Sequence, residues 1–339
     1  MTRRTDRRPL TRFGLQFSNF TYPGVPDAQL FERIAASART AEDSGFDSVW
    51  VMDHFYQIPV PVAGGGREEP MIEAYSLLSA LAARTSTVRL GTLVTGLTYR
   101  NPALLAKIVT SLDVISSGRA VLGVGAAWND DEHEGYGFDF PPTGERLSRL
   151  EETLRIVRAM FREDSPSFEG RYYRISEALN RPRPVTPGGP PILVGGAGEK
   201  RTLRLVARYA DACNLFGDIP MVRHKLEVLA AHCEAEGRDP AEITKTKLCA
   251  LIIAETEEEA ERRLAEQIDA GRFAERTTAA GADPEDLRAR AVVGSPEQVA
   301  EQVREHIAAG LDGMIFHLPP AADLDTIRLA GATLTGAVW

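Results

Sequence analysis

The sequence predicts an α/β protein that folds as one (β/α)8 barrel, and three observations support this prediction. Eight apolar segments alternate with helical segments along the 339 residues, near residues 15, 50, 91, 122, 193, 214, 251 and 315. Strict alternation of this kind is typical of parallel strands joined by right-handed helical crossovers. No linker separates the units, which favours a closed barrel over two doubly wound domains.

The third observation is a short pattern that recurs directly after helices. Glycine, a large apolar residue, aspartate, a small residue and an apolar run follow one another at residues 45–50 and again at 310–315. Residues 210–215 carry a weaker copy. One local pattern used several times indicates a repeated βα unit.

Each element has its own local signal. Asp27 is expected to cap the first helix and Gly45 to end it, while Asn101 followed by Pro102 is expected to start the helix after the third strand. The strands are short apolar runs of the kind that both faces of a parallel sheet bury. The expected strands are residues 12–20, 49–52, 88–95, 120–125, 192–194, 212–216, 248–254 and 314–318, and the expected helices include residues 71–84 and 145–161.

Three stretches fall outside this alternation. Residues 1–11 carry four arginines without apolar companions and are expected to form a disordered basic tail before a barrel domain of residues 12–339. Residues 56–70 are rich in proline and glycine and are expected to form a long irregular loop. Residues 168–184 contain adjacent tyrosines and several prolines, and a hairpin-like insertion is expected there.

The composition argues against several classes of function. A formal net charge of -9 and a pI near 5.4 argue against a nucleic-acid or anionic-membrane partner. No apolar run approaches the roughly 20 residues of a membrane helix, and no secretory signal follows the basic start. The three cysteines lack ligand spacing, which favours buried thiols over disulfides or zinc. The cytoplasm is the expected location, and no metal site is expected.

Gly195, Gly196, Ala197 and Gly198 form a glycine-rich junction between a strand and a helix. Such a junction lets backbone N–H groups approach an anion at a helix N-terminus. Basic residues directly after it, Lys200 and Arg201 among them, oppose the helix dipole, which makes sense beside a bound phosphate. The alternative is a tight turn with solvated basic side chains. A dinucleotide fingerprint does not fit, because Arg201 stands where the third small residue belongs.

Asp53 and His54 follow the second strand, at the end of the barrel where such folds keep their chemistry. His54 could act as a general acid or base, and a buried structural histidine is the alternative. The same two interpretations apply to His317, which ends the last strand. The acidic residues 129–134 are interpreted as a solvated face with one helix-capping member rather than as metal ligands.

The order and spacing of several segments resemble the luciferase-like monooxygenase superfamily, and within it the actinobacterial branch that depends on the deazaflavin F420. The resemblance covers nearly the whole chain after the tail. The similar segments are residues 45–55 (GFDSVWVMDHF), 89–102 (RLGTLVTGLTYRNP), 118–128 (GRAVLGVGAAW), 168–184 (FEGRYYRISEALNRPRP), 191–198 (PILVGGAG) and 294–316.

The resemblance implies a TIM-type barrel with an insertion between strands four and five. It also implies that F420, or FMN as the alternative cofactor, lies at the carboxyl ends of the strands. Asp53 and His54 would then lie near the reactive ring. Leu93 and Val94 match the place where relatives form a non-proline cis peptide against the ring, and Gly195 to Gly198 match the segment around the cofactor phosphate.

One position departs from the resemblance. Relatives that oxidise a sugar phosphate with F420 carry a glutamate close to the position of Trp128, which argues against that substrate here. Trp128 is instead expected to form a wall of the ring or substrate site. The predicted function is hydride transfer between F420 and a small organic substrate, with His54 as proton donor or clamp on the ring.

Two alternatives stay open for the function. One is an FMN-dependent two-component monooxygenase, and the other is a non-catalytic carrier or sensor of flavin or deazaflavin. Relatives commonly form dimers, so a homodimer is expected.

Overall fold

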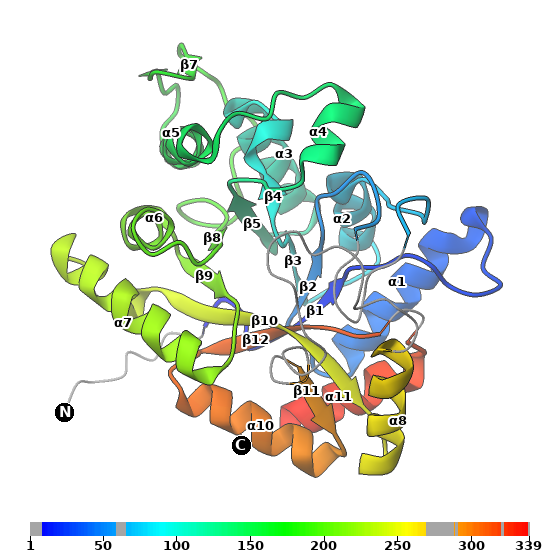
Figure 1. Ribbon diagram of the computed structural model, residues 1–339. Coiled ribbons are helices and arrows are strands. Elements are labelled where there is room, and N and C mark those ends of the chain that lie inside the picture. The colour runs from blue at the N-terminus through cyan, green and yellow to red at the C-terminus, as the bar shows by residue number, and fades with distance from the viewer. Residues whose placement is uncertain (1–8, 59–65, 269–287, 289–290, 320–321, 338–339) are drawn as a thin grey trace.

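A computed structural model describes residues 9–58, 66–268, 288, 291–319 and 322–337. Eight parallel strands form its centre, each paired with the next, and the last pairs with the first (Figure 1). The predicted closed barrel is therefore confirmed. The strands are β1 (Phe13–Phe17), β2 (Ser48–Val51), β3 (Arg89–Thr92), β5 (Ala120–Gly125), β8 (Ile192–Gly195), β9 (Ala212–Leu215), β10 (Thr244–Ile253) and β12 (Gly313–His317).

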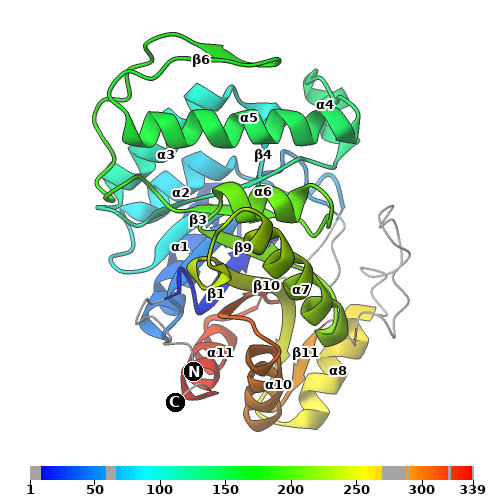
Figure 2. The same ribbon diagram turned by 90° about the vertical axis from the view of Figure 1, so that its left-hand side faces the viewer.

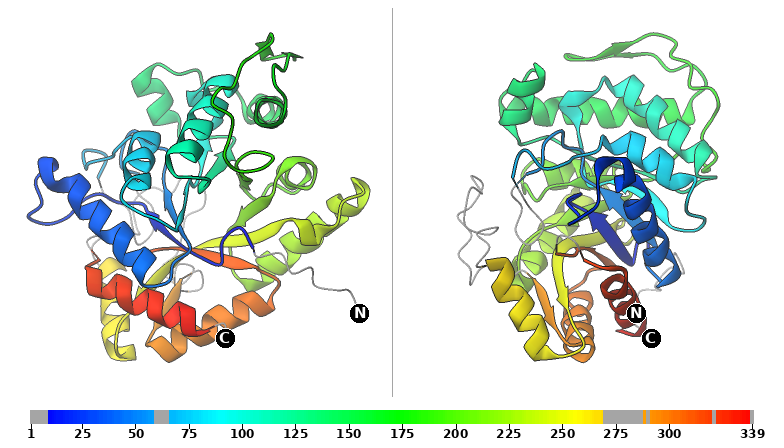
Figure 3. Two further views of the ribbon diagram at one scale, coloured as in Figure 1. Left: turned by 180° about the vertical axis from the view of Figure 1, so that it is seen from behind. Right: turned by 90° about the vertical axis from the view of Figure 1, so that its right-hand side faces the viewer.

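Helices surround the strands as an outer ring, as two views from opposite sides show (Figures 1 and 3). The ring contains α1 (Asp27–Asp43), α2 (Ala74–Ala82), α3 (Pro102–Ile115), α5 (Thr143–Arg162), α6 (Thr202–Tyr209), α7 (Ile219–Ala235), α10 (Pro296–Ala308) and α11 (Leu324–Ala337). Smaller elements are β4 (Thr95–Gly96), η1 (Leu97–Tyr99), α4 (Asp130–Tyr136), η2 (Pro240–Glu242), α8 (Glu257–Gln267) and β11 (Val292–Gly294).

The predicted insertion between the fourth and fifth barrel strands is a short hairpin of β6 (Phe168–Glu169) and β7 (Arg174–Ile175). Figure 2 shows this segment beyond α5, at the periphery of the molecule. The carboxylate of Glu152 on α5 accepts the backbone N–H groups of residues 171–173 at the hairpin turn. One buried carboxylate thus anchors the insertion to the helix layer.

The barrel interior is filled around Trp50, which is completely buried. Its indole lies against Gly14 and Gly91, where an added Cβ would come within 2.6 Å and 2.8 Å of the ring. The small residues on the flanking strands therefore make room for one large side chain. Apolar residues of the other strands, including Val121, Leu193 and Ile315, pack around it.

The recurring aspartates make the same contact at three strand starts. Asp47, Asp211 and Asp312 each accept a backbone N–H at the start of the neighbouring strand, within one residue of its first position, at 2.6, 2.9 and 2.9 Å. Their own N–H groups donate to carbonyls on those neighbouring strands. The pattern in the sequence therefore corresponds to the same pair of hydrogen bonds, repeated at three places at the amino-terminal end of the barrel.

Two boundary predictions at the N-terminal side are wrong. Leu10 and Thr11 are buried, and the Thr11 hydroxyl donates to Asp47, so these residues belong to the barrel and not to a disordered tail. Of the rest of that predicted tail, Pro9 is half-buried and residues 1–8 lie outside the described residues. Pro26, not Asp27, occupies the cap position of α1, and Asp27 lies in its first turn, where its charge still suits the helix dipole.

Three further boundaries differ from the expected ones. The helix expected over residues 71–84 is limited to α2, because Glu73 caps it at Ser76 N–H. The strand expected over residues 88–95 is interrupted after β3 by the pair Leu93–Val94. Strand β10 begins at Thr244, four residues before the expected start at Leu248, since its polar first residues pair with β9 and β12 and Thr246 and Lys247 are buried there. Asn101 caps α3 as predicted, and its side chain accepts the N–H of Ala103.

Candidate active site

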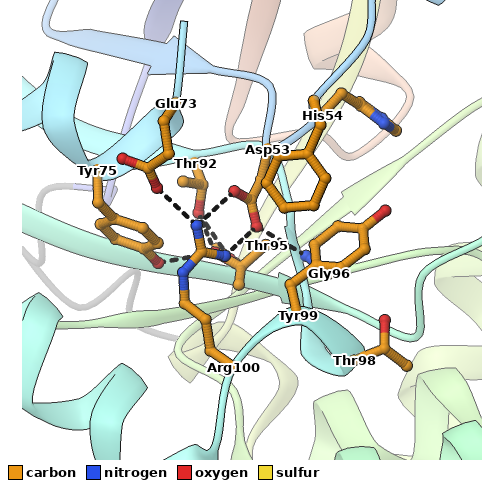
Figure 4. Close-up of polar contacts among 12 residues, drawn as sticks. Asp53, His54, Glu73, Tyr75, Thr92, Thr95, Gly96, Thr98, Tyr99 and Arg100 are labelled. Carbon is orange, nitrogen blue, oxygen red and sulfur yellow. Dashed lines mark hydrogen bonds and ion pairs between the residues drawn. The ribbon is translucent and has the colours of Figure 1, made fainter. Parts of the chain in front are cut away.

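Asp53 and His54 are consecutive residues whose side chains point in different directions (Figure 4). The Asp53 carboxylate is directed at Arg100, whereas the His54 ring is directed away from that cluster. The two residues predicted together are thus positioned for different tasks.

Asp53 is 2% exposed and forms a two-pronged ion pair with Arg100. The Arg100 guanidinium donates to its two carboxylate oxygens at 2.6 and 2.9 Å, and the N–H of Gly96 donates to Oδ2 at 3.2 Å. Arg100 also donates to Glu73 at 2.7 Å. Burial opposes the charge of Arg100, but the Asp53 carboxylate outweighs it, and the pKa of Arg100 is raised. Burial raises the pKa of Asp53 and the Arg100 charge opposes this rise, and the pair fixes the chain between Gly96 and Arg100.

Tyr75 extends this cluster toward the barrel wall. Its ring lies under the Arg100 guanidinium, 4.9 Å from the ring centre, and its hydroxyl shares a 2.7 Å hydrogen bond with Thr95. Burial and the nearby Asp53 raise the pKa of Tyr75 to about 12, so its hydroxyl keeps its proton at neutral pH. Thr95 in turn contacts Thr92 at 2.8 Å (Figure 4). The segment on both sides of Leu93–Val94 is therefore held by a continuous polar network.

His54 is paired with Glu132, a residue of α4. The Nδ1 atom of His54 lies 2.7 Å from Oε2 of Glu132, whose side chain is fully buried. Glu132 also accepts the N–H groups of Phe55 and Tyr56 and the hydroxyl of Tyr99, at 2.5, 3.1 and 3.0 Å. Burial disfavours the carboxylate, but the hydrogen bond and charge of His54 and the N–H groups of Tyr56 and Phe55 outweigh it, and the pKa of Glu132 is lowered.

An ionised Glu132 can only accept hydrogen bonds, so it selects the tautomer of His54 that carries the proton on Nδ1. The Nε2 lone pair then remains available for a proton from a ligand. A carboxylate that orients an imidazole in this way is the usual arrangement behind a histidine acid–base catalyst.

Aromatic side chains position α4 beneath His54. The next residue of this helix, His133, has both ring nitrogens engaged, with Thr98 at 2.6 Å and the carbonyl of Asn129 at 2.6 Å. Its ring lies between Tyr99 and Phe140, with centroids 4.8 and 4.5 Å away. This packing explains how a seven-residue helix can hold Glu132 in one place.

The acidic stretch at residues 129–134 was expected to be a solvated face, and for two of its members this is wrong. Glu132 and His133 are 0% and 1% exposed, because they face the barrel mouth and the aromatic cluster. Asp130 and Asp131 lie in the first turn of α4, where negative charge suits the helix dipole.

The peptide bond between Leu93 and Val94 is cis, as the resemblance implied. The Val94 side chain lies over the inward-facing Gly125 and Gly195. An added Cβ at either glycine would come within 2.8 Å of a Val94 methyl group. Val94 and the two glycines therefore form a surface with few side chains at the carboxyl ends of β3, β5 and β8, and this surface is called the platform below.

Two exposed aromatic side chains follow barrel strands at the same end of the barrel. Trp128 is 53% exposed, and its ring meets the His54 ring edge to face, with 5.7 Å between centroids. Phe216, directly after β9, is 48% exposed. Large apolar side chains of this kind left open to solvent are typical of binding sites.

The glycine-rich junction follows β8 and turns through Gly196, whose φ is +117°. A residue with a side chain is strained in that conformation, so glycine is required there. Helix α6 begins at Thr202, so Lys200 and Arg201 precede the helix rather than lying in its first turn. Arg201 donates to the carbonyl of Gly144 and to Ser148 on α5. It therefore braces α5, and the backbone of residues 195–198 remains as the candidate anion contact.

Within the described residues, no group of His, Cys, Asp or Glu side chains could hold a metal ion. In the same part of the chain, no helix combines the length and the apolar character that a membrane span requires.

Comparisons with known proteins agree with this architecture. The family model described as luciferase-like monooxygenase matches residues 11–313, so the chain belongs to that family. The resemblance recognised in the sequence is confirmed.

Among its relatives is an F420-dependent glucose-6-phosphate dehydrogenase of Kineococcus radiotolerans, 30% identical over 314 residues, with 85% of this chain and 87% of the relative covered. The fold is similar to the monooxygenase RslO1 of Streptomyces bottropensis, with a TM-score of 0.77, 24% identity, and coverage of 96% of this chain and 99% of that chain. It is also similar to an F420-dependent secondary alcohol dehydrogenase in complex with an F420–acetone adduct, with a TM-score of 0.78, 20% identity, and coverage of 97% and 99%.

Proposed function

We propose that this protein is an F420-dependent oxidoreductase that transfers a hydride between the deazaflavin and a small organic substrate. The observation that carries the proposal is the His54–Glu132 pair beside a flat platform at the mouth of a luciferase-like barrel. The F420-dependent relative that matches most of the chain supports the choice of cofactor.

The residues around the mouth fit a flat heteroaromatic ring. Val94 offers an apolar surface, and Gly125 and Gly195 keep side chains away from it. Leu93 belongs to the same support, since its carbonyl accepts the Gln16 side-chain N–H at 3.1 Å. The backbone at Gly195, Gly196, Ala197 and Gly198 would hold the cofactor phosphate. When bound, F420 supplies the hydride chemistry, and the protein orients it and excludes water.

His54 would hold or deliver the proton that accompanies hydride transfer. Glu132 keeps the Nδ1 proton in place, so Nε2 is the atom that exchanges a proton with substrate. Asp53 does not reach this position, because Arg100 and Gly96 occupy its carboxylate. Its proposed role is to hold the segment that carries Val94.

Trp128 would form one wall of the site, on the side where the substrate binds. Its edge contact with His54 and its exposure support a position beside the reacting atoms. A site bordered by indole and imidazole suits a small neutral substrate better than a sugar phosphate.

Titration of the purified protein with F420 and, separately, with FMN tests the cofactor. We expect saturable binding of F420 with clear preference over FMN, followed by oxidation of bound reduced F420 when a carbonyl acceptor is added anaerobically. Preference for FMN, together with oxygen consumption, would replace the proposal with a two-component monooxygenase. Tight F420 binding without transfer to any acceptor would favour a carrier or sensor.

We also propose that the chain forms a homodimer through α3 and the segment beside it. Leu104, Ile115, Leu179 and Val185 are all at least half exposed, at 53, 50, 68 and 52%. Hydrogen bonds from Asn180 and Thr186 to α3 hold that segment along the helix, so these apolar side chains belong to one region. Light scattering of wild type and of Leu104→Glu tests this, and a monomeric wild type would contradict it. The proposed location is the cytoplasm, where the buried free thiols of all three cysteines remain reduced.

A further inference from the structure

The inner wall of the barrel carries a histidine with an unsatisfied buried atom. Within the described part of the chain, Nδ1 of His317 is buried and has no hydrogen-bond partner. Buried polar atoms in folded proteins are nearly always paired, and each exception calls for an explanation such as an ordered water, an ion or a role in catalysis. The same is true of Nδ2 of Asn214, although the Oδ1 atom of that side chain accepts the Thr246 hydroxyl.

His317 faces the barrel interior close to the mouth. It is the last residue of β12, where Ile315 also points inward and Phe316 points outward into the helix layer. On β10, His317 lies opposite Ala250 and Asn214 lies opposite Thr246. His317 therefore lies nearer the carboxyl ends of the strands, on the side where His54 and Val94 are found.

The imidazole of His317 is neutral. Burial lowers its pKa to about 4, and the side chain is only 9% exposed. A neutral imidazole offers one N–H donor and one lone pair. It suits an uncharged carbonyl oxygen or ring N–H, and it offers no charge to a phosphate or carboxylate.

One neighbouring strand connects His317 to the platform. Gln16 of β1 is paired with His317 in the strand register, and its side chain donates to the carbonyl of Leu93. Val94, Gln16 and His317 are thus successive parts of one surface across the mouth. A ligand bound across this surface would meet His317 as the polar group at its β12 end.

We propose that His317 is a ligand-binding residue that hydrogen-bonds a carbonyl oxygen or ring N–H at the edge of the heteroaromatic cofactor. The inference rests on the proposed function, since it assumes that a ring of this class binds at the mouth. Flavin and deazaflavin rings both carry such an edge, so it applies to F420 and to FMN.

Fluorescence titration with F420 and with FMN tests the inference in wild type, His317→Phe and His317→Asn. Phenylalanine keeps the ring shape without its polar atoms, and asparagine keeps a polar atom near the position of Nδ1. We expect His317→Phe to weaken binding of the preferred cofactor by about 5- to 100-fold, and His317→Asn to recover most of that loss.

His306→Gln is the matched control. His306 is also a buried histidine with an unpaired Nδ1, but it lies on α10 outside the barrel and contacts Lys247 at 2.9 Å. Glutamine keeps a polar atom toward Lys247, so cofactor affinity should equal that of wild type.

Thermal unfolding of the cofactor-free proteins separates a binding role from a structural one. Removing an unpaired buried atom should leave the melting temperature of His317→Phe equal to that of wild type or a few degrees higher. A large decrease in melting temperature together with weaker binding would make His317 structural and overturn the inference. Unchanged affinity of His317→Phe would overturn it too while the proposed function stands, whereas a wild type that binds neither cofactor would overturn both.

Discussion

Replacing Glu132 with glutamine tests whether this carboxylate controls His54. The Oε1 atom of Glu132 accepts the two backbone N–H groups of Phe55 and Tyr56, so the amide oxygen of a glutamine should take that position. Its NH2 group then faces Nδ1 of His54 and the hydroxyl of Tyr99. Because the amide donates where the carboxylate accepted, His54 must move its proton to Nε2.

The size of the effect follows from the four hydrogen bonds. Hydrogen bonds to a charged group contribute about 1.5–3 kcal/mol each, roughly twice the value of neutral ones. Glutamine keeps neutral bonds at most positions, so we expect a loss of about 2–3 kcal/mol in the free energy of unfolding. Alanine leaves buried donors unpaired, and we expect about 4–5 kcal/mol.

The pH dependence has a defined sign. The pKa of Glu132 is lower in the folded state than in the unfolded chain. The ionised carboxylate therefore stabilises the folded protein fully above the unfolded pKa, and this stabilisation is lost as pH falls through the folded pKa. The stability difference between wild type and Glu132→Gln should therefore be largest near neutral pH and should shrink below about pH 4.

Denaturant unfolding and nitrogen NMR of the histidine side chains measure both effects without knowledge of the substrate. Wild type should show His54 protonated on Nδ1, and Glu132→Gln should show it protonated on Nε2. Once an acceptor is known, turnover of the glutamine variant should fall about 10²- to 10⁴-fold, by analogy with other carboxylate–histidine pairs, while F420 affinity stays unchanged. An unaltered His54 tautomer, or equal stability losses for glutamine and alanine, would refute the reasoning.

Three further predictions concern the mouth of the barrel. Gly195→Ala places a methyl group within 2.8 Å of Val94, so titration should show weaker cofactor binding, whereas Gly144→Ala meets no atom within 4 Å and should bind normally. Burial lowers the pKa of His317 to about 4, so the unfolded chain, with a value near 6.5, binds the proton first and wild type loses stability as pH falls from 6.5 to 4. In denaturant unfolding, the free energy of unfolding of His317→Phe should therefore rise by about 3 kcal/mol relative to that of wild type as pH falls from 6.5 to 4. Wild type should not reduce F420 with glucose 6-phosphate, and detectable reduction would contradict the role given to Trp128.

The barrel could be predicted because its signals are local and repeated. Each strand is a short apolar run after a turn, and the recurring aspartates at positions 47, 211 and 312 make the same hydrogen bonds to the neighbouring strand. The start of β10 could not be predicted in this way. Its first residues have the sequence TKTK, which is typical of an exposed segment. In the structure Lys247 is only 1% exposed, and its ammonium group contacts His306 in the helix layer.

Only some residues of the candidate site could be predicted from the sequence. His54 could be identified because it directly follows a buried strand, but Glu132 is one of four acids between residues 130 and 134, and nothing local distinguishes it. Its burial depends on how α4 rotates against Tyr99, which is a tertiary contact. Arg100 was missed as well, although a buried aspartate such as Asp53 requires a counter-charge and could have prompted a search for one.

The two adjacent residues Asp53 and His54 remain coupled even though their side chains diverge. Asp53 fixes Gly96 and Arg100 at the two ends of a short segment, and this segment contains η1. Tyr99, the last residue of η1, donates to Glu132, and Glu132 holds His54. The buried ion pair therefore acts on the imidazole through one helical turn and one carboxylate. Because Leu93 and Val94 lie just before the same segment, the Asp53–Arg100 pair contributes both to the position of the ring platform and to the orientation of His54.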